Sequence, residues 1–140
     1  MSGATMRTGR IGFLAALLFA SPIPMGVTLS LTQAAAEQKF PDVVAAKVTS
    51  LGGGSFDFDV TISSPYDTRQ RYADGFRVVG PNGEVYGERK LLHDHADEQP
   101  FTRDLHGVAI PAGVRTVAVE ARDLSHGYGG RRLEVALPGR

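Results

Sequence analysis

Hydrophobic and polar residues alternate along much of the chain after residue 42. The clearest run is 56–62, where Phe, Phe, Val and Ile take every second position, with Asp, Asp and Thr between them. A period of two predicts a β-strand with one buried face and one solvated face. Similar short runs lie between turn residues, at 43–48, 75–79, 84–92, 101–105, 114–120 and 133–137. The pattern therefore predicts seven short strands.

Turn residues between these runs favour antiparallel pairing. Pro-Asn-Gly at 81–83 separates two runs and is a strong hairpin signal, because Asn and Gly tolerate positive φ. No window after residue 36 holds a sustained period of 3.6, so helices are expected to be absent or very short. Seven strands in about 100 residues predict a seven-stranded antiparallel β-sandwich of the immunoglobulin-like kind. An open barrel is the alternative fold.

The first 36 residues have the pattern of a signal peptide. Arg7 and Arg10 precede a stretch, 11–31, that contains no charged residue, and Ala-Ala-Ala at 34–36 offers a cleavage site. An uncleaved membrane anchor is the alternative, because about 20 uncharged residues can span a bilayer. Prolines at 22 and 24 interrupt that stretch and favour cleavage. We therefore expect a signal peptide at 1–36, a single domain at 37–140, and a periplasmic or secreted location.

Composition narrows the possible functions. Thirteen basic and fifteen acidic residues remain after position 36, a net charge of −2, whereas nucleic-acid binding needs a basic surface. The charge also gives no support for membrane binding after signal cleavage. The chain contains no cysteine, which excludes disulfides, thiolate metal ligands and processing as a lipoprotein through a cysteine.

Alternate loops of an antiparallel sandwich emerge at the same end. The loops 63–74, 92–100 and 122–131 are therefore expected to share one pole, and they contain three of the four histidines. His93 and His95 lie two residues apart, on one side of an extended chain, and His126 could supply a third nitrogen. Imidazole and carboxylate ligands suit Zn, Cu or Ni, so these three histidines are the predicted metal ligands. The alternative is a polar loop with solvated histidines.

Other residues of this pole could support a metal or contact a ligand. The acidic candidates are Asp94, Asp97 and Glu98, which could act as further metal ligands or accept hydrogen bonds from the imidazoles. Arg103 could pair with Asp97 or Glu98, although an exposed arginine is an equal alternative. Tyr66, Tyr72 and Tyr128 could supply rigid contact area in the loops, or could only cap the core.

The sequence contains no complete catalytic signature. His93-x-His95-x-Asp97 resembles the opening of the metallo-β-lactamase motif, but Glu98 stands where that family has a histidine, and the chain is too short for its fold. A Gly-x-Ser-x-Gly nucleophile elbow and a phosphate-binding loop are also absent from the sequence. The leading hypothesis is non-catalytic metal binding. A metal-free module that binds a protein or small ligand through the same loops is second, and a metal-dependent hydrolase with Glu98 as base is third.

Three segments carry a resemblance to known proteins: Tyr-Ala-Asp-Gly-Phe at 72–76, His-Asp-His-Ala-Asp-Glu-Gln-Pro-Phe-Thr-Arg at 93–103 and His-Gly-Tyr-Gly-Gly at 126–130. Across 72–138 the chain resembles a group of small, uncharacterised secreted bacterial proteins. The general architecture resembles immunoglobulin or fibronectin type III domains, without the Cys and Trp framework of antibody domains. The resemblance implies an exported β-domain and no particular activity.

Overall fold

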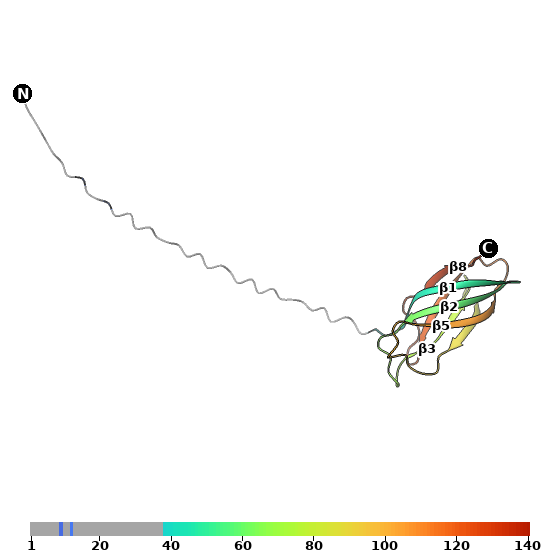
Figure 1. The fold of residues 1–140 in the computed structure, drawn as a ribbon, viewed down its shortest axis with the longest axis horizontal. Helices are drawn as coiled ribbons and strands as arrows, with labels where there is room; N and C mark the ends of the chain where they lie inside the picture. The colour runs from blue at the N-terminus through green and yellow to red at the C-terminus, as the bar shows by residue number, and fades with distance from the viewer. Residues whose placement is uncertain (1–8, 10–11, 13–37) are drawn as a thin grey trace, which may run out of the picture. The chain divides into compact units, whose positions relative to one another are not determined.

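The structure is a computed structural model that describes residues 38–140 together with Gly9 and Gly12 (Figure 1). The predicted signal peptide at 1–36 therefore lies outside the described residues, apart from those two glycines. Residues 38–140 belong to one compact unit. In this described part of the chain, no helix is long and apolar enough to cross a membrane.

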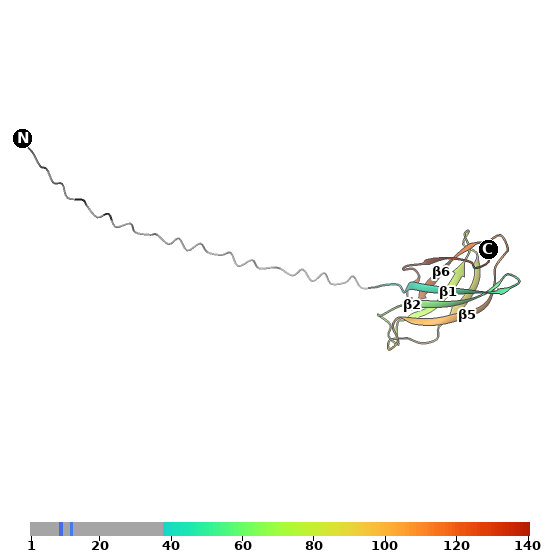
Figure 2. The same ribbon diagram turned by 45° about the horizontal axis from the view of Figure 1, so that its top comes forward.

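The folded unit consists of eight strands in two antiparallel sheets, with no helix among residues 38–140. The first sheet has the order β1-β2-β5, and the second has the order β4-β3-β6-β7, with β8 also paired to β6. The strands are β1 (Asp42–Gly52), β2 (Ser55–Ser63), β3 (Ala73–Val79), β4 (Val85–Lys90), β5 (Phe101–Ala109), β6 (Thr116–Asp123), β7 (Gly127–Tyr128) and β8 (Leu133–Ala136). In both ribbon views, β1, β2 and β5 lie side by side (Figures 1 and 2).

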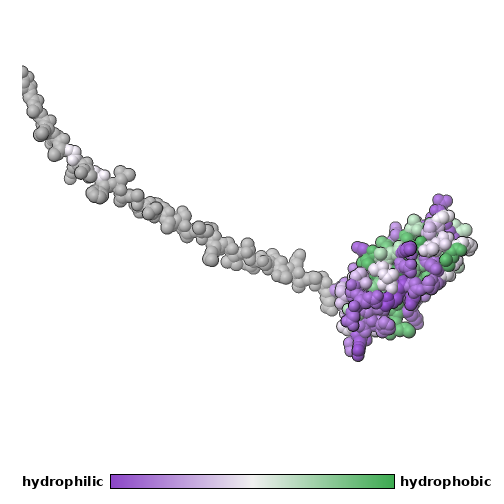
Figure 3. Space-filling view, viewed as in Figure 1, coloured by the Kyte–Doolittle hydropathy of each residue, from purple (hydrophilic) through white to green (hydrophobic). Residues whose placement is uncertain are grey.

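The core lies between the two sheets, as a β-sandwich requires. Every second residue of β2 is at most 2% exposed, and these residues are Phe56, Phe58, Val60 and Ile62. They pack in one cluster with buried residues of the other sheet, among them Phe76, Val78, Val117 and Val119. This inward alternation confirms the period-two prediction for 56–62. The polar positions of the same strand face outward, and most of the visible surface is hydrophilic (Figure 3).

The observed strands differ from the predicted ones in number and length. The chain has eight strands rather than seven, because Gly127 and Tyr128 fold back and pair with Asp123 and Arg122 at the end of β6. β4 ends at Lys90, two residues earlier than predicted. Because the strands form two separate open sheets, the barrel alternative is wrong.

Candidate functional site

The loops 63–74, 92–100 and 122–131 come together, as predicted from the antiparallel order. Gln99 of the second loop receives a hydrogen bond from the Ser64 backbone N–H at 2.8 Å. Its amide also donates to the Ser64 hydroxyl at 3.2 Å. Arg71 of the first loop reaches Asp123 at the start of the third. These three loops are called the loop pole below.

Asp67 ties two parts of the loop pole together from the inside. Its side chain is 5% exposed, and one carboxylate oxygen accepts a hydrogen bond from the Ala73 backbone N–H at 3.1 Å. The other oxygen accepts from the backbone N–H of His95 at 3.0 Å. A buried carboxylate satisfied by backbone donors fixes the path of both loops. Its role is therefore to hold the loops in place.

Asp123 has the same role in the third loop and is fully buried. One oxygen accepts from the backbone N–H groups of Ser125 and His126, both at 2.9 Å, and the Arg71 Nε lies 3.2 Å from the other oxygen. Burial alone would raise the pKa of Asp123. Interactions with the Tyr66 hydroxyl, His126 and the Ser125 N–H outweigh burial and hold that pKa below its ordinary value.

Tyr66 belongs to the same arrangement. Its ring is covered by the Arg71 guanidinium, 4.2 Å from the ring centroid. The buried hydroxyl lies beside the Asp123 carboxylate, outside good hydrogen-bond geometry. Burial and this neighbouring carboxylate raise the pKa of Tyr66 far above its usual range. Tyr66 therefore supports the pole from within.

The three histidines predicted as metal ligands are not assembled. The rings of His93 and His95 are neighbours, with centroids 4.8 Å apart. His95 is 6% exposed and stacks on Phe101 at 4.0 Å, while the Nδ1 of His126 lies 3.0 Å from Asp123. Among residues 38–140 and the two described glycines, no group of three or more His, Cys, Asp or Glu side chains is arranged to hold a metal ion.

The acidic candidates of this loop face different partners. Asp94 accepts a hydrogen bond from the Ala96 backbone N–H at 3.3 Å, which shapes the local turn. Asp97 is exposed to solvent. Glu98 pairs with Arg103 at 2.9 Å, one of the two pairings considered for that arginine, and this partner lowers the pKa of Glu98. These side chains therefore do not converge on the histidines as a ligand shell.

The loop pole also forms one edge of a cavity of about 220 Å³. Each of the three loops contributes an apolar side chain to its lining: Tyr72, Leu92 and Leu124. Leu92 is 82% exposed and Leu124 is 42% exposed, which makes them two of the four exposed large apolar residues in the described part of the chain. An exposed apolar cluster on loops that internal hydrogen bonds hold in place is a typical contact surface for a partner.

A charged pair lies in the lining of this cavity. Arg122 donates to Asp74 Oδ2 at 2.6 Å. The other oxygen, Oδ1, is buried and has no hydrogen-bond partner among the described residues. Burial raises the pKa of Asp74, and Arg122 only partly opposes that effect. Glu88 and Lys90 of β4 also line the cavity, which thus combines an apolar rim with four charged side chains.

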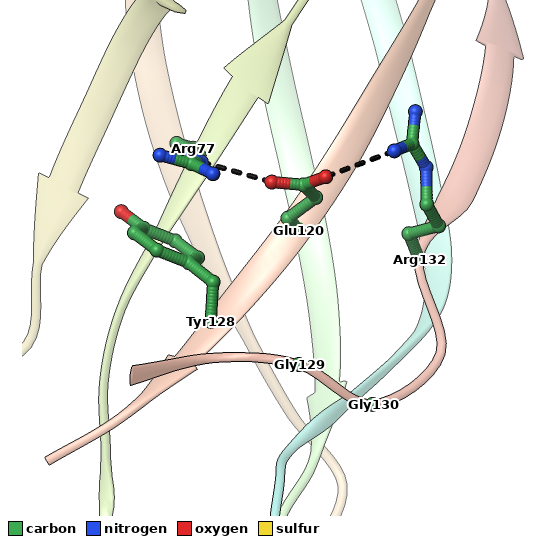
Figure 4. A pocket seen from close by; sticks show the side chains of 6 residues that line it. All are labelled: Arg77, Glu120, Tyr128, Gly129, Gly130 and Arg132. Carbon is green, nitrogen blue, oxygen red and sulfur yellow. Dashed lines mark hydrogen bonds and ion pairs between the residues drawn. The ribbon is translucent and has the colours of Figure 1, made fainter. Parts of the chain in front are cut away.

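Tyr128, the remaining predicted contact residue, lines a second and larger cavity. This cavity of about 320 Å³ lies on the outer face of the five-stranded sheet, and we call it the arginine pocket. Its lining consists of Arg77, Glu120, Tyr128, Gly129, Gly130 and Arg132 (Figure 4). Glu120 lies between the two guanidiniums, 2.9 Å from Arg77 and 3.0 Å from Arg132.

Sequence reasoning missed Asp67, Asp123 and the two arginines of the pocket. Arg77 and Glu120 occupy outward positions of predicted strands, but only the register of β3 against β6 makes them partners. One local feature of the sequence could have indicated Asp123. An aspartate can cap a turn by accepting hydrogen bonds from the backbone N–H groups two and three residues later, which here are those of Ser125 and His126. Nothing local indicated that Asp67 would reach His95, 28 residues away.

The chain is similar to a protein of Halomicrobium mukohataei. Over 94 residues it is 37% identical to a "Putative lipoprotein" of Halomicrobium mukohataei, a match that covers 67% of this chain and 46% of that protein. The chain therefore spans about half of the length of the relative it matches. No family model matches the chain. No solved structure matches it significantly, so the resemblance to immunoglobulin or fibronectin type III domains stays at the level of the β-sandwich.

Proposed function

We propose that this chain is an exported, non-catalytic binding domain of the cell envelope that contacts a protein partner through its loop pole. One observation carries the proposal: all three loops place an apolar side chain around the same cavity. Tyr72, Leu92 and Leu124 come from loops that are far apart in sequence. Such convergence fits recognition by loops on a rigid scaffold, which is where binding residues usually lie.

Two findings support export to the envelope. The first 36 residues have the charge and hydropathy pattern of a signal peptide. The relative in Halomicrobium mukohataei carries the name of a lipoprotein, a class of proteins held at membranes by lipid. The 140 residues of this chain contain no cysteine to which a lipid could be attached. We therefore propose a periplasmic or secreted form without a lipid on these residues.

The internal ties of the loop pole favour binding over catalysis. Asp67 and Asp123, the two buried carboxylates of the pole, are engaged by backbone N–H groups and by Arg71. A general base would need a carboxylate or imidazole that faces the cavity. Of the two carboxylates that line it, Asp74 is paired with Arg122 and Glu88 is exposed on β4. Loops that are ordered before binding lose little conformational entropy when a partner docks.

The cavity indicates the chemistry of the partner. The apolar rim suits an aliphatic or aromatic side chain, and the charged side chains that also line the cavity suit a polar group next to it. A polypeptide segment supplies both, because each residue that inserts a side chain also carries a backbone N–H. The partner is therefore proposed to be a protein that presents an apolar residue, with a small ligand as the competing outcome.

Metal binding is the second candidate, and the neighbouring rings of His93 and His95 are the observation that favours it. Two imidazoles could hold Zn²⁺, Cu²⁺ or Ni²⁺, with water or an outside ligand completing the coordination. The third proposed nitrogen, on His126, is engaged by Asp123 instead. The hydrolase hypothesis depends on the same metal and on Glu98, which is paired with Arg103.

The binding proposal is tested by site-specific photo-crosslinking in cells that naturally produce the protein. A photoreactive residue is placed at position 92 or at position 124, and adducts are identified by mass spectrometry. Leu51 provides the matched control, because it is also a leucine and 55% exposed but lies at the opposite end of the sandwich. We expect the same partner protein at both pole positions and not at position 51.

A second variant tests whether the apolar rim itself makes the contact. Tyr72→Ser removes one wall of the cavity and should reduce the adduct formed from position 92 by several-fold, at unchanged protein level. Adducts that form equally from position 51, or no protein adduct from either pole position, would contradict the proposal. The latter result would direct attention to a small ligand.

A further inference from the structure

The arginine pocket holds two cationic groups and one anionic group. Arg77 projects from β3, Glu120 projects from β6 as its cross-strand partner, and Arg132 precedes β8. Glu120 is the most enclosed of the three, with a side chain 17% exposed, against 30% for Arg77 and 53% for Arg132. One carboxylate therefore serves two guanidiniums, and these three side chains carry a formal charge of +1. Glu88 of β4, which stands opposite Arg77 on its other side, is exposed and adds a negative charge nearby.

Each guanidinium retains hydrogen-bond donors beyond those used by Glu120. Arg77 donates from Nε, and Arg132 donates from one terminal nitrogen. A guanidinium has five N–H groups in a planar fork. No other hydrogen bond is formed by either guanidinium within the described residues. The remaining donors border a cavity of about 320 Å³.

The pocket is held in a fixed arrangement by its neighbours. Figure 4 shows the Arg77 guanidinium over the Tyr128 ring. It lies 3.7 Å from the ring centroid. This stacking fixes the plane of the fork. Below it, Gly129 and Gly130 pack so closely on Phe40 and Pro41 that an added Cβ would collide with them. Contact with Phe40 and Pro41 therefore fixes the position of the pocket wall that these two glycines form.

We infer that the arginine pocket is a binding site for a carboxylate group. Planar guanidinium forks match carboxylate and phosphate oxygens, so both anions fit by geometry. The charge distinguishes them, because the cost of removing an anion from water grows with the square of its charge, whereas its attraction to a cluster of net charge +1 grows only in proportion to its charge. A single carboxylate brings the cluster to neutrality. The site opens on the sheet face and shares residues 128–130 with the third loop of the loop pole. None of its lining residues lines the cavity around Tyr72, Leu92 and Leu124, so its test is separate from that of the partner proposed above.

A carboxylate can come from a small organic acid or from the acidic side chain of a peptide. Both present the same group to the two arginines, and the cavity is large enough for either end group. Two probes distinguish the sources. Glutarate represents the free acid, and an end-blocked Gly-Glu-Gly peptide represents the acidic side chain.

The inference is tested by NMR titration of the purified protein with glutarate, with the blocked peptide and with inorganic phosphate. We expect saturable shifts of the Gly129 and Gly130 amide signals with a carboxylate, and weaker binding of phosphate. Arg132→Gln should weaken carboxylate binding about tenfold, because it removes a charge-assisted hydrogen bond. Arg131→Gln is the matched control, since its side chain does not line the pocket.

Glu120→Gln provides a test in the opposite direction. This variant removes the internal carboxylate that competes for both guanidiniums and should tighten carboxylate binding several-fold. Circular dichroism of each variant verifies that it is folded. Tighter binding in E120Q together with weaker binding in R132Q supports the site. If neither probe gives saturable shifts, or if both variants bind like the R131Q control, the assignment is wrong.

Discussion

Replacement of Asp123 tests how the loop pole is held together. The side chain is fully buried, and it interacts with Arg71 and with two backbone N–H groups of the turn that leads into β7. Asp123→Ala removes the carboxylate and leaves the Arg71 guanidinium beside an empty, partly buried volume. Asp123→Asn retains one carbonyl oxygen of nearly the same shape, so it can still accept from the turn.

The magnitude follows from what is removed. Loss of one partner from a buried ion pair costs about 3–5 kcal/mol. The low end applies here, because the Arg71 side chain is 21% exposed and water can reach it. We therefore expect Asp123→Ala to lower the free energy of unfolding by about 3 kcal/mol and Asp123→Asn by about half of that. For a domain of about 100 residues, the larger loss corresponds to a decrease in Tm of roughly 12–24 °C.

Urea denaturation at several pH values measures the effect. The pKa of Asp123 is lower in the folded protein than in the unfolded chain, so its contribution is complete above about pH 4 and is lost as the pH falls through the folded value. The difference in the free energy of unfolding between the wild type and Asp123→Ala should therefore become smaller at acidic pH. Asp59→Ala, an exposed aspartate on β2, is the control. A loss below about 1 kcal/mol for Asp123→Ala at pH 7 would refute the reasoning.

Two further predictions concern the histidines. Burial, reinforced by Arg103, lowers the pKa of His95, so the folded protein binds fewer protons there than the unfolded chain does, and its stability should decrease as the pH falls below about 6.5. Thermal unfolding at pH 7.5 and pH 5 should show a smaller decrease in Tm for His95→Gln than for the wild type. An equal decrease in Tm would contradict this assignment. Added Zn²⁺, Cu²⁺ or Ni²⁺ should change Tm by less than about 1 °C, because the imidazoles of His93 and His95 lie side by side but that of His126 is engaged by Asp123 instead; a larger increase that is lost in His93→Ala would support the metal hypothesis.

Strands with strict alternation could be predicted from the sequence, and strands that depend on a partner could not. In β2 the alternation of Phe and Val with Asp and Thr is a local property of the chain, and burial follows it residue by residue. β7 has two residues and no pattern of its own. It exists because Gly127 adopts a φ of 80° and the turn is held by Asp123. Its position depends on that fully buried side chain, which no periodicity reveals.

The predicted histidine site rested on an assumption about backbone shape. Residues two apart point to the same side only in an extended chain, and the segment that contains His93 and His95 is not a strand: the chain bends at His93, and a turn begins at Ala96. The two rings are still neighbours, but the backbone N–H of His95 is bound by Asp67 and its ring stacks on Phe101. The sequence placed the loops at one pole correctly. It could not indicate which polar groups would be used internally.

The internal use of polar groups decides what the molecule can offer to a partner. Asp67 and Asp123 are carboxylates, which makes them the first candidates for ligand binding at the loop pole. Each is buried, however, and accepts hydrogen bonds from the backbone N–H groups that shape the loops. A carboxylate that holds its loop in place cannot turn away to bind a ligand, because the loop pole would then lose its shape. The remaining outward chemistry is of two kinds: apolar side chains where the loops meet, and the excess guanidinium donors of Arg77 and Arg132 on the sheet. Apolar contact and carboxylate binding are complementary modes of recognition, and neither requires a catalytic residue. The two surfaces also differ in their expected dependence on salt, because screening weakens the arginine pocket and leaves the apolar rim nearly unaffected.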